Sequence, residues 1–372
     1  MTRLAVLFAG IALALAPVAA GAGPAVQASA WIVQDARSGD VLAASRPHAR
    51  LPIASITKLM TVLVTLERRG LDDVVDVDRR AGAVGESTLA LNGGEHLAVR
   101  DLIKAALIQS ANDAADALAL SVSPGFPSFA ALMNAEARRL GLRDTHFVRP
   151  DGLDAPGEYS SAADVTRLAR VVMRIPFVRQ TVREQTATIA GGRTLHTWDD
   201  LLALYPQTIG VKTGHTALAG WCQVAAARGV GGTTVYATLL GSATRAQRND
   251  DLQSLLVWGL ARFRVVPAVQ AGRSYASVAV GYGKGPLRLV AAKPLLAVAR
   301  IDRPLTETVV AARGASLPVR RGTVLGRVVI RDGSRVVGRR DLVASRTINK
   351  PGVAGRLRWY AGRTLHHLTH LF

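Results

Sequence analysis

Residues 55–58, Ser-Ile-Thr-Lys, place a hydroxyl and an amine three positions apart, directly before an apolar run at residues 59–66. This run is apolar nearly all round and is followed by Gly70, which predicts a buried helix ending at a glycine C-cap. Positions i and i+3 share one helix face, so Lys58 would lie next to Ser55. A serine becomes a good nucleophile when a neighbouring base takes its proton. A lysine can be that base if burial or nearby positive charge lowers its pKa.

Lysine is scarce in this chain, which adds weight to Lys58. Only six of the 46 basic residues are lysines, and the other basic residues are arginines. Arginine stays protonated in proteins and cannot act as a base. A lysine with apolar flanks in such a chain is therefore a candidate for proton transfer, although biased codon usage could also leave a few lysines by accident.

A second pair of polar side chains follows in Ser110-Ala111-Asn112. This stretch separates a helical run at residues 101–109 from another at residues 113–118. A serine and an asparagine on such a tight turn can point into one cleft. The same residue types also serve as ordinary helix N-caps, so this stretch alone does not decide between the two interpretations.

A third motif, Lys212-Thr213-Gly214, lies in a predicted strand. A glycine inside a strand often marks the close approach of a ligand or of another backbone segment. The alternative interpretation is a loop lysine beside a turn.

The order S-x-x-K, S-x-N and K-T-G is the signature of the penicillin-recognising serine enzymes. The residues around the motifs, at 54–61, 110–115, 152–157 and 210–216, closely resemble the low-molecular-mass D-alanyl-D-alanine carboxypeptidases. These are penicillin-binding proteins that trim peptidoglycan. The resemblance extends from about Ala30 to Phe263, with a looser match beyond.

The resemblance implies a role for each residue of the first two motifs. Ser55 would be the nucleophile that forms an acyl-enzyme with the penultimate D-alanine of a stem peptide and releases the terminal one. Lys58 would be the general base. Ser110 and Asn112 would complete the proton relay and hold the substrate amide.

The resemblance also implies that residues 212–215 read the substrate. Lys212 would keep positive charge in the cleft, depress the pKa of Lys58 and attract the substrate carboxylate. Thr213 would hydrogen-bond that carboxylate, and Gly214 would belong to the same substrate-binding strand. The backbone N–H groups of His215 and of the nucleophile would form an oxyanion hole.

Three further places bear on the predicted site. Arg248 matches the carboxylate-binding arginine of the family, whose fork can grip a carboxylate bidentately, but it could also be an ordinary arginine at the start of a helix. The stretch 149–152 departs from the family pattern, and its Asp151 could alter deacylation or substrate preference. Ala111 stands where the family usually has glycine.

The motifs and the ends of the chain together predict four parts. Residues 1–22 have the pattern of a cleavable secretory signal. Residues 28–264 would form an α/β catalytic domain of the β-lactamase/transpeptidase-like fold, with a central antiparallel sheet flanked by helices. Residues 265–348 carry short Val-rich runs and an Asp-Gly hairpin signal, which predicts a small all-β domain. Residues 353–372 follow the pattern of an amphipathic helix that anchors the protein on a membrane.

Composition limits the partners. The net charge of +19 raises the question of nucleic acid, but aromatics make up only 5%, no nucleic-acid motif is present and a signal peptide argues against it. Anionic cell wall and the anionic outer face of the cytoplasmic membrane are better partners for an exported protein. The eight histidines show no metal-binding spacing, so no metal or other cofactor is predicted. Cys222, the single cysteine, is expected to be a buried structural thiol.

Three other functions remain open at this stage. A D,D-endopeptidase that cuts cross-links would use the same residues. A β-lactamase would share the motifs, although no E-x-x-L-N occurs between Asn112 and Lys212. A non-catalytic wall-binding or penicillin-sensing protein would not need an intact nucleophile and base.

Overall fold

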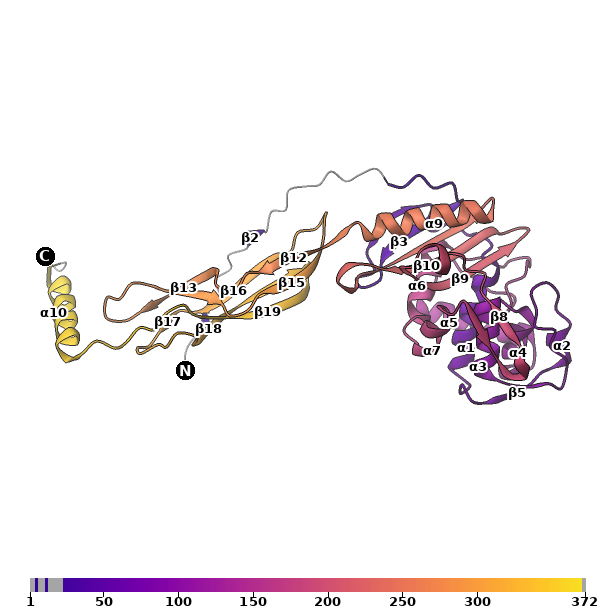
Figure 1. Ribbon diagram of the computed structural model, residues 1–372, viewed down its shortest axis with the longest axis horizontal. Coiled ribbons are helices and arrows are strands. Elements are labelled where there is room, and N and C mark those ends of the chain that lie inside the picture. The colour runs from indigo at the N-terminus through magenta and orange to yellow at the C-terminus, as the bar shows by residue number, and fades with distance from the viewer. Residues whose placement is uncertain (1–3, 6–10, 13–22, 370–372) are drawn as a thin grey trace. The chain divides into compact units, whose positions relative to one another are not determined.

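The computed structural model describes residues 4–5, 11–12 and 23–369. The chain divides into two compact units (Figure 1). Residues 21–261 form the α/β unit. Residues 262–369, together with residues 4–5 and 11–12, form the β unit.

The α/β unit is built on a five-stranded antiparallel sheet, which confirms the predicted central sheet. Its strands, in spatial order, are β4 (Val41–Ser45), β3 (Ala30–Asp35), β11 (Thr234–Ser242), β10 (Gly220–Arg228) and β9 (Thr208–Thr216). The lysine motif lies on β9. Because β9 is an edge strand, one of its sides is left open for a ligand.

Helices cover both faces of this sheet, as the sequence predicts. In α9 (Arg245–Leu260), Gly259 lies against Val235 of β11. In α6 (Ala162–Val172), Thr166 Oγ1 lies 2.6 Å from Thr238 Oγ1 of the same strand. Residues 235 and 238 point to opposite faces of a strand, so α9 and α6 lie on opposite sides.

The remaining elements lie mostly on the α6 side. They are η1 (Ala54–Thr57), α1 (Lys58–Leu66), α2 (Arg79–Gly82), α3 (Val99–Lys104), the π-turn η2 (Ala105–Gln109), α4 (Asn112–Val122), α5 (Phe126–Leu140), α7 (Pro176–Thr181), η3 (Ala190–Gly192), α8 (Leu201–Leu204) and η4 (Val230–Gly232), with the hairpins β5–β6 (Val74–Asp76, His96–Ala98) and β7–β8 (Thr186–Thr188, Thr194–His196).

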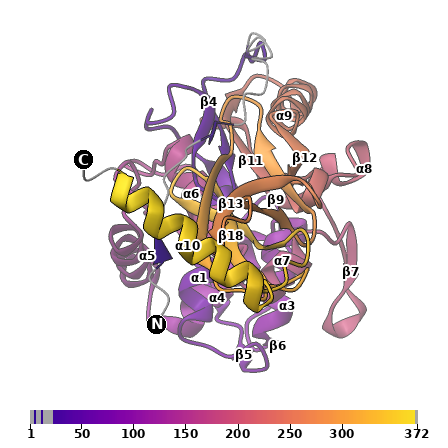
Figure 2. The same ribbon diagram turned by 90° about the vertical axis from the view of Figure 1, so that its left-hand side faces the viewer.

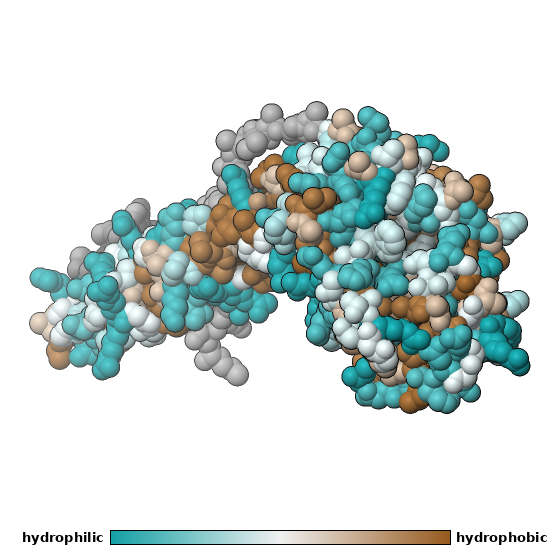
Figure 3. Space-filling model, turned by 45° about the vertical axis from the view of Figure 1, so that its right-hand side comes forward, coloured by the Kyte–Doolittle hydropathy of each residue, from teal (hydrophilic) through white to brown (hydrophobic). Residues whose placement is uncertain are grey.

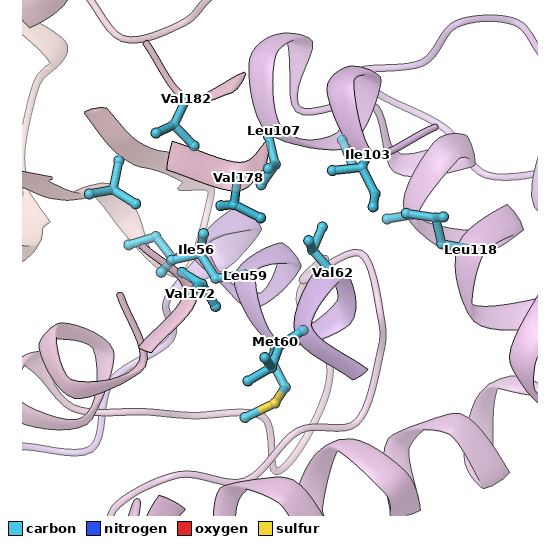
Figure 4. Packing of buried hydrophobic residues seen from close by; sticks show 14 of the residues in the cluster. Ile56, Leu59, Met60, Val62, Ile103, Leu107, Leu118, Val172, Val178 and Val182 are labelled. Carbon is cyan, nitrogen blue, oxygen red and sulfur yellow. The ribbon is translucent and has the colours of Figure 1, made fainter. Parts of the chain in front are cut away.

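Helix α1 is the centre of the core. Every residue from Lys58 to Thr65 is buried, and Figure 4 shows Leu59, Met60 and Val62 surrounded by hydrophobic side chains of other elements. The predicted glycine C-cap is wrong, because α1 ends at Leu66. The backbone N–H of Gly70 instead donates to Asp73 Oδ2, so this glycine belongs to the next turn.

The β unit contains eight strands of the C-terminal segment. They are β12 (Phe263–Val269), β13 (Ser274–Val280), β14 (Leu287–Ala291), β15 (Leu295–Arg300), β16 (Thr306–Ala312), β17 (Gly314–Ala315), β18 (Val324–Asp332) and β19 (Arg335–Ala344). The predicted hairpin joins β18 to β19, and Gly333 takes a φ of 57° in its turn. These strands enclose a hydrophobic core of their own.

The predicted signal segment falls almost entirely outside the described residues. Only β1 (Leu4–Ala5) and β2 (Ile11–Ala12) are described there, and both pair antiparallel with β16.

The terminal helix α10 (Val353–Thr369) follows the β unit, and residues 370–372 lie outside the described part. Its Trp359 packs on Tyr282 of the β unit, with ring centroids 5.3 Å apart, and Figure 2 shows the length of the helix. Among the described helices, none is both long and apolar enough to cross a membrane.

Candidate active site

Ser55 lies in the short helix η1, which leads directly into α1. Two glycines let other segments approach it. A Cβ on Gly152, whose φ is 79°, would lie 2.2 Å from the carbonyl oxygen of Ala54. A Cβ on Gly214 of β9 would lie 2.7 Å from the carbonyl oxygen of Ile53 and 3.1 Å from the backbone nitrogen of Ser55. The glycine of the lysine motif therefore brings the edge strand next to the N–H of Ser55.

Lys58 is fully buried and its amine contacts three acceptors. Its Nζ lies 2.7 Å from Ser55 Oγ, 2.7 Å from Asn112 Oδ1 and 2.6 Å from the carbonyl oxygen of Asp151. The predicted pairing of serine and lysine is thus present in the geometry. Asn112 of the second motif and Asp151 of the stretch 149–152, which departs from the family pattern, therefore contact the same amine.

Ser110 takes a left-handed conformation, with a φ of 63°, between η2 and α4. This turn directs Ser110 Oγ to Lys212 Nζ, 2.9 Å away, while Asn112 faces the other lysine. The N-cap of α4 is Ala111, which makes no side-chain cap bond. The capping interpretation therefore does not describe what these two side chains do.

The two lysines differ in their electrostatics. Burial lowers the pKa of Lys58 to about 8, opposed by the charges of Asp151 and Asp116. Burial, and then the charge of Lys58, lower the pKa of Lys212 well below its usual range. Burial is thus the main reason for the lowered pKa of Lys58, and the repulsion between the lysines acts on Lys212. A substrate carboxylate beside Lys212 would favour its charged form.

Arg248 lies on α9 and is buried at the edge of the same cleft. Its Nη2 lies 2.9 Å from Asp200 Oδ2, and its guanidinium stacks 5.5 Å from the centre of the Trp221 ring. Burial lowers the pKa of Arg248, and Asp200 opposes this shift. A fixed, oriented guanidinium of this kind can receive a carboxylate.

The cleft is a cavity of about 220 Å³. Seven of the predicted residues line it, namely Ser55, Ser110, Asn112, Thr213, Gly214, His215 and Arg248. The two predicted lysines, Lys58 and Lys212, lie beneath it, almost entirely buried.

Four further lining residues escape the sequence motifs, namely Glu86, Ser87, Trp198 and Trp221. Trp221 packs on His215 with ring centroids 4.1 Å apart. Trp198 is 45% exposed and donates from Nε1 to the carbonyl oxygen of Gln109. Tryptophan is rare, with five in the chain, and this rarity is the one signal that could have drawn attention to Trp198 and Trp221.

Behind Lys58 lies a group of buried acids that the sequence analysis did not foresee. Asp151 is fully buried and its carboxylate is held by Arg149, with Nη2 2.5 Å from Oδ2. Asp116, one turn after Asn112 on α4, is 1% exposed, and its Oδ1 has no hydrogen-bond partner among the described residues. Burial raises the pKa of Asp116 to about 8, and burial raises that of Glu158 to about 7.

Known proteins resemble this chain in sequence and in fold. A D-alanyl-D-alanine carboxypeptidase DacD from Salmonella typhimurium is 32% identical over 357 residues, which cover 91% of this chain and 90% of the relative. Penicillin binding protein 5 from Haemophilus influenzae has a TM-score of 0.64 at 26% identity, covering 88% of this chain and 99% of that chain.

Penicillin-Binding Protein D2 from Listeria monocytogenes, solved in its ampicillin-bound form, has a TM-score of 0.59 at 31% identity. The match covers 64% of this chain and 99% of that chain. The family model of peptidase S11, D-alanyl-D-alanine carboxypeptidase, matches residues 17–244, which include all three motifs. This chain therefore belongs to the S11 family of D-alanyl-D-alanine carboxypeptidases.

Proposed function

We propose that this serine-type carboxypeptidase removes the terminal D-alanine from peptidoglycan stem peptides with Ser55 as nucleophile and Lys58 as its base. The contact between Lys58 Nζ and Ser55 Oγ, 2.7 Å long, carries the proposal. Burial lowers the pKa of this lysine to about 8, so it loses its proton much more readily near neutral pH than an ordinary lysine does.

In the acylation step, Ser55 Oγ attacks the carbonyl carbon of the penultimate D-alanine and its proton passes to Lys58. The negative oxygen that forms is stabilised by the backbone N–H groups of Ser55 and His215. A donor of this type contributes about 3 kcal/mol to transition-state stabilisation. Ser110, held by Lys212, passes a proton to the leaving amine, and the proton taken up by Lys58 replaces it, so that the terminal D-alanine departs. Water then hydrolyses the ester on Ser55, which releases the shortened peptide and restores the free serine.

Recognition of the substrate rests on its free carboxylate. Lys212 supplies positive charge beneath the cleft, Thr213 offers a hydroxyl and Arg248 offers a guanidinium fork. A β-lactam carries a carboxylate beside a strained amide and therefore acylates the same serine. This dependence on a terminal carboxylate favours a carboxypeptidase over an endopeptidase.

The experiment pairs a D-Ala-D-Ala-terminated stem peptide with fluorescent penicillin. The wild-type protein should release D-alanine and become covalently labelled, and Ser55→Ala should do neither while keeping its thermal midpoint. Ser87→Ala, in the same cleft, should retain labelling and serves as the matched control. Labelling of Ser55→Ala at another residue would refute the assignment of the nucleophile.

The same assay tests the carboxylate. Amidation of the terminal D-alanine removes the anion and should reduce kcat/KM by about 10-fold or more, as expected for loss of a charge-assisted contact. Equal turnover of the amide would point instead to an endopeptidase.

We further propose that the protein acts outside the cytoplasm, as a peripheral protein on the outer face of the cytoplasmic membrane, held there by α10. Val353, Leu357 and Tyr360 of α10 are each more than half exposed, and Arg356 and Arg358 lie among them. Apolar burial and attraction of the arginines to anionic headgroups would both contribute to binding. The packing of Trp359 on Tyr282 is an additional contact that the amphipathic pattern does not foresee.

A further inference from the structure

A second hollow, of about 840 Å³, lies in the α/β unit away from the cleft. Residues of β3, β4, the end of α5 and the length of α6 line it. Strand β4 is one edge of the sheet and β9 is the other, with β3, β11 and β10 between them. The hollow is therefore separate from the site around Ser55.

Arginine dominates the lining of this hollow, here called the arginine groove. Five arginines line it, namely Arg139, Arg143, Arg167, Arg170 and Arg174, against two aspartates. Hydrophilic side chains are spread widely over the face of this protein that Figure 3 shows.

The acidic residues of the groove are already engaged. Asp144 is held by His48 and Arg50, with atoms 3.1 and 3.3 Å apart. Asp164 accepts from the backbone N–H of Asp144 and from Thr145 Oγ1. Neither carboxylate binds an arginine that lines the groove.

The arginines of the groove, by contrast, are mostly without acidic partners. Arg139 is the exception, because it pairs with both Glu136 and Glu67. The side chains of Arg143, Arg167 and Arg174 make no hydrogen bond or ion pair with any residue that the structure describes. Three guanidinium forks thus remain available for a ligand.

Arg170 is built into the floor of the groove. Its guanidinium donates to Gln34 Oε1 at 3.3 Å and to the carbonyl oxygen of Ala36 at 3.1 Å. Its Nε is buried without a hydrogen-bond partner among the described residues. A buried donor without an acceptor is costly, so the fold holds this charge in the floor of the groove at the expense of stability.

The spacing of these arginines indicates an extended ligand. Arg167 and Arg170 stand at i and i+3 on one face of α6, and Arg174 follows in the turn after the helix; all three line the groove. The outer two are about 10 Å apart along the axis, at 1.5 Å per residue. Like charges at this spacing repel each other. One small anion cannot reach all three, whereas a chain with several anionic groups can.

We propose that the arginine groove binds a linear polyanion that carries phosphate groups along its chain. Guanidinium forks pair bidentately with phosphate, and a phosphodiester keeps its charge at any physiological pH. The concave shape fits a chain better than a flat membrane surface. Such binding would hold the enzyme on an anionic polymer while the cleft at β9 stays open to substrate.

The test measures binding of the full-length protein to dye-labelled inorganic polyphosphate by fluorescence anisotropy. Arg167→Gln/Arg174→Gln should weaken binding by about 10-fold or more and reduce its salt dependence, because fewer counterions are released. Arg143→Gln alone should weaken binding less. Arg183→Gln/Arg228→Gln, which removes the same charge from exposed sites outside the groove, should bind as wild type does.

Labelling by fluorescent penicillin should be unchanged in every variant, which shows that the fold and the cleft are intact. Equal losses in the two double variants would overturn the proposal, because net charge alone would then explain binding. A second result would also overturn the proposal. It is unchanged polyphosphate binding in Arg167→Gln/Arg174→Gln together with a loss of binding to polyglutamate or to anionic vesicles.

Discussion

At the residue scale, the charges of buried acids oppose the loss of the proton from Lys58, the proposed base. Lys58 and Asp116 both titrate near pH 8, because burial lowers one pKa and raises the other. When two interacting groups have similar pKa values, each observed titration step reflects both groups and cannot be assigned to one of them. Ionised Asp116 raises the pKa of Lys58, since an opposite charge favours the charged form of the lysine.

The expected consequence is a pH-dependent acylation rate. Lys58 accepts the proton of Ser55 only when it is deprotonated, so the rate of labelling by fluorescent penicillin should rise with pH through about 8. Asp116→Asn removes the ionisable carboxyl, lowers the pKa of Lys58 and should move this rise to lower pH. Stopped-flow labelling across the neutral and alkaline range measures the shift.

Asp72→Asn is the matched control, because it removes one exposed carboxylate and should leave the profile in place. If the profile of Asp116→Asn coincides with that of wild type, the charge of Asp116 does not reach the base.

At the element scale, the contact between β9 and η1 brings Gly214 next to the backbone nitrogen of Ser55, one of the two proposed oxyanion donors. Gly214→Ala would place a Cβ 2.7 Å from the carbonyl oxygen of Ile53, so the strand must move away from Ser55. A displacement of this kind should reduce the acylation rate constant by about 10-fold to 100-fold. The labelling rate at saturating fluorescent penicillin gives this constant directly.

Gly281→Ala in the β unit, where a Cβ meets open space, should leave the rate unchanged. A normal rate in Gly214→Ala would mean that the approach of the strand is not needed for acylation.

At the scale of the whole molecule, α10 is the part whose removal should separate binding from catalysis. Deletion of residues 353–372 leaves both hydrophobic cores complete. The shortened protein should remain soluble and active, and should lose most of its co-sedimentation with anionic vesicles. Binding of the full-length protein should weaken as salt rises, because part of the attraction is electrostatic.

Equal co-sedimentation of the shortened and full-length proteins would contradict the anchor proposal. It would indicate that α10 only packs on the β unit through Trp359.

Local patterns were sufficient for much of this protein. The i, i+3 geometry that puts Lys58 beside Ser55, the turn at Ser110 and the hairpin at Gly333 depend on neighbouring residues. Helix and turn geometry alone therefore predicts them. The resemblance in motif order added the family and the assignment of Lys212, Thr213 and Arg248 to one site.

Only the tertiary structure decided which distant groups meet. Lys212 reaches Ser110 across 102 residues, and Arg248 meets Asp200 across 48. Such contacts depend on strand register and on how α4 and α9 pack, which no local pattern contains. The end of α1 at Leu66, the buried position of Asp116 and the arginine groove arise in the same way. Burial and charge at each place come from segments far apart in the chain, and these segments become neighbours only when the sheet and its helices assemble.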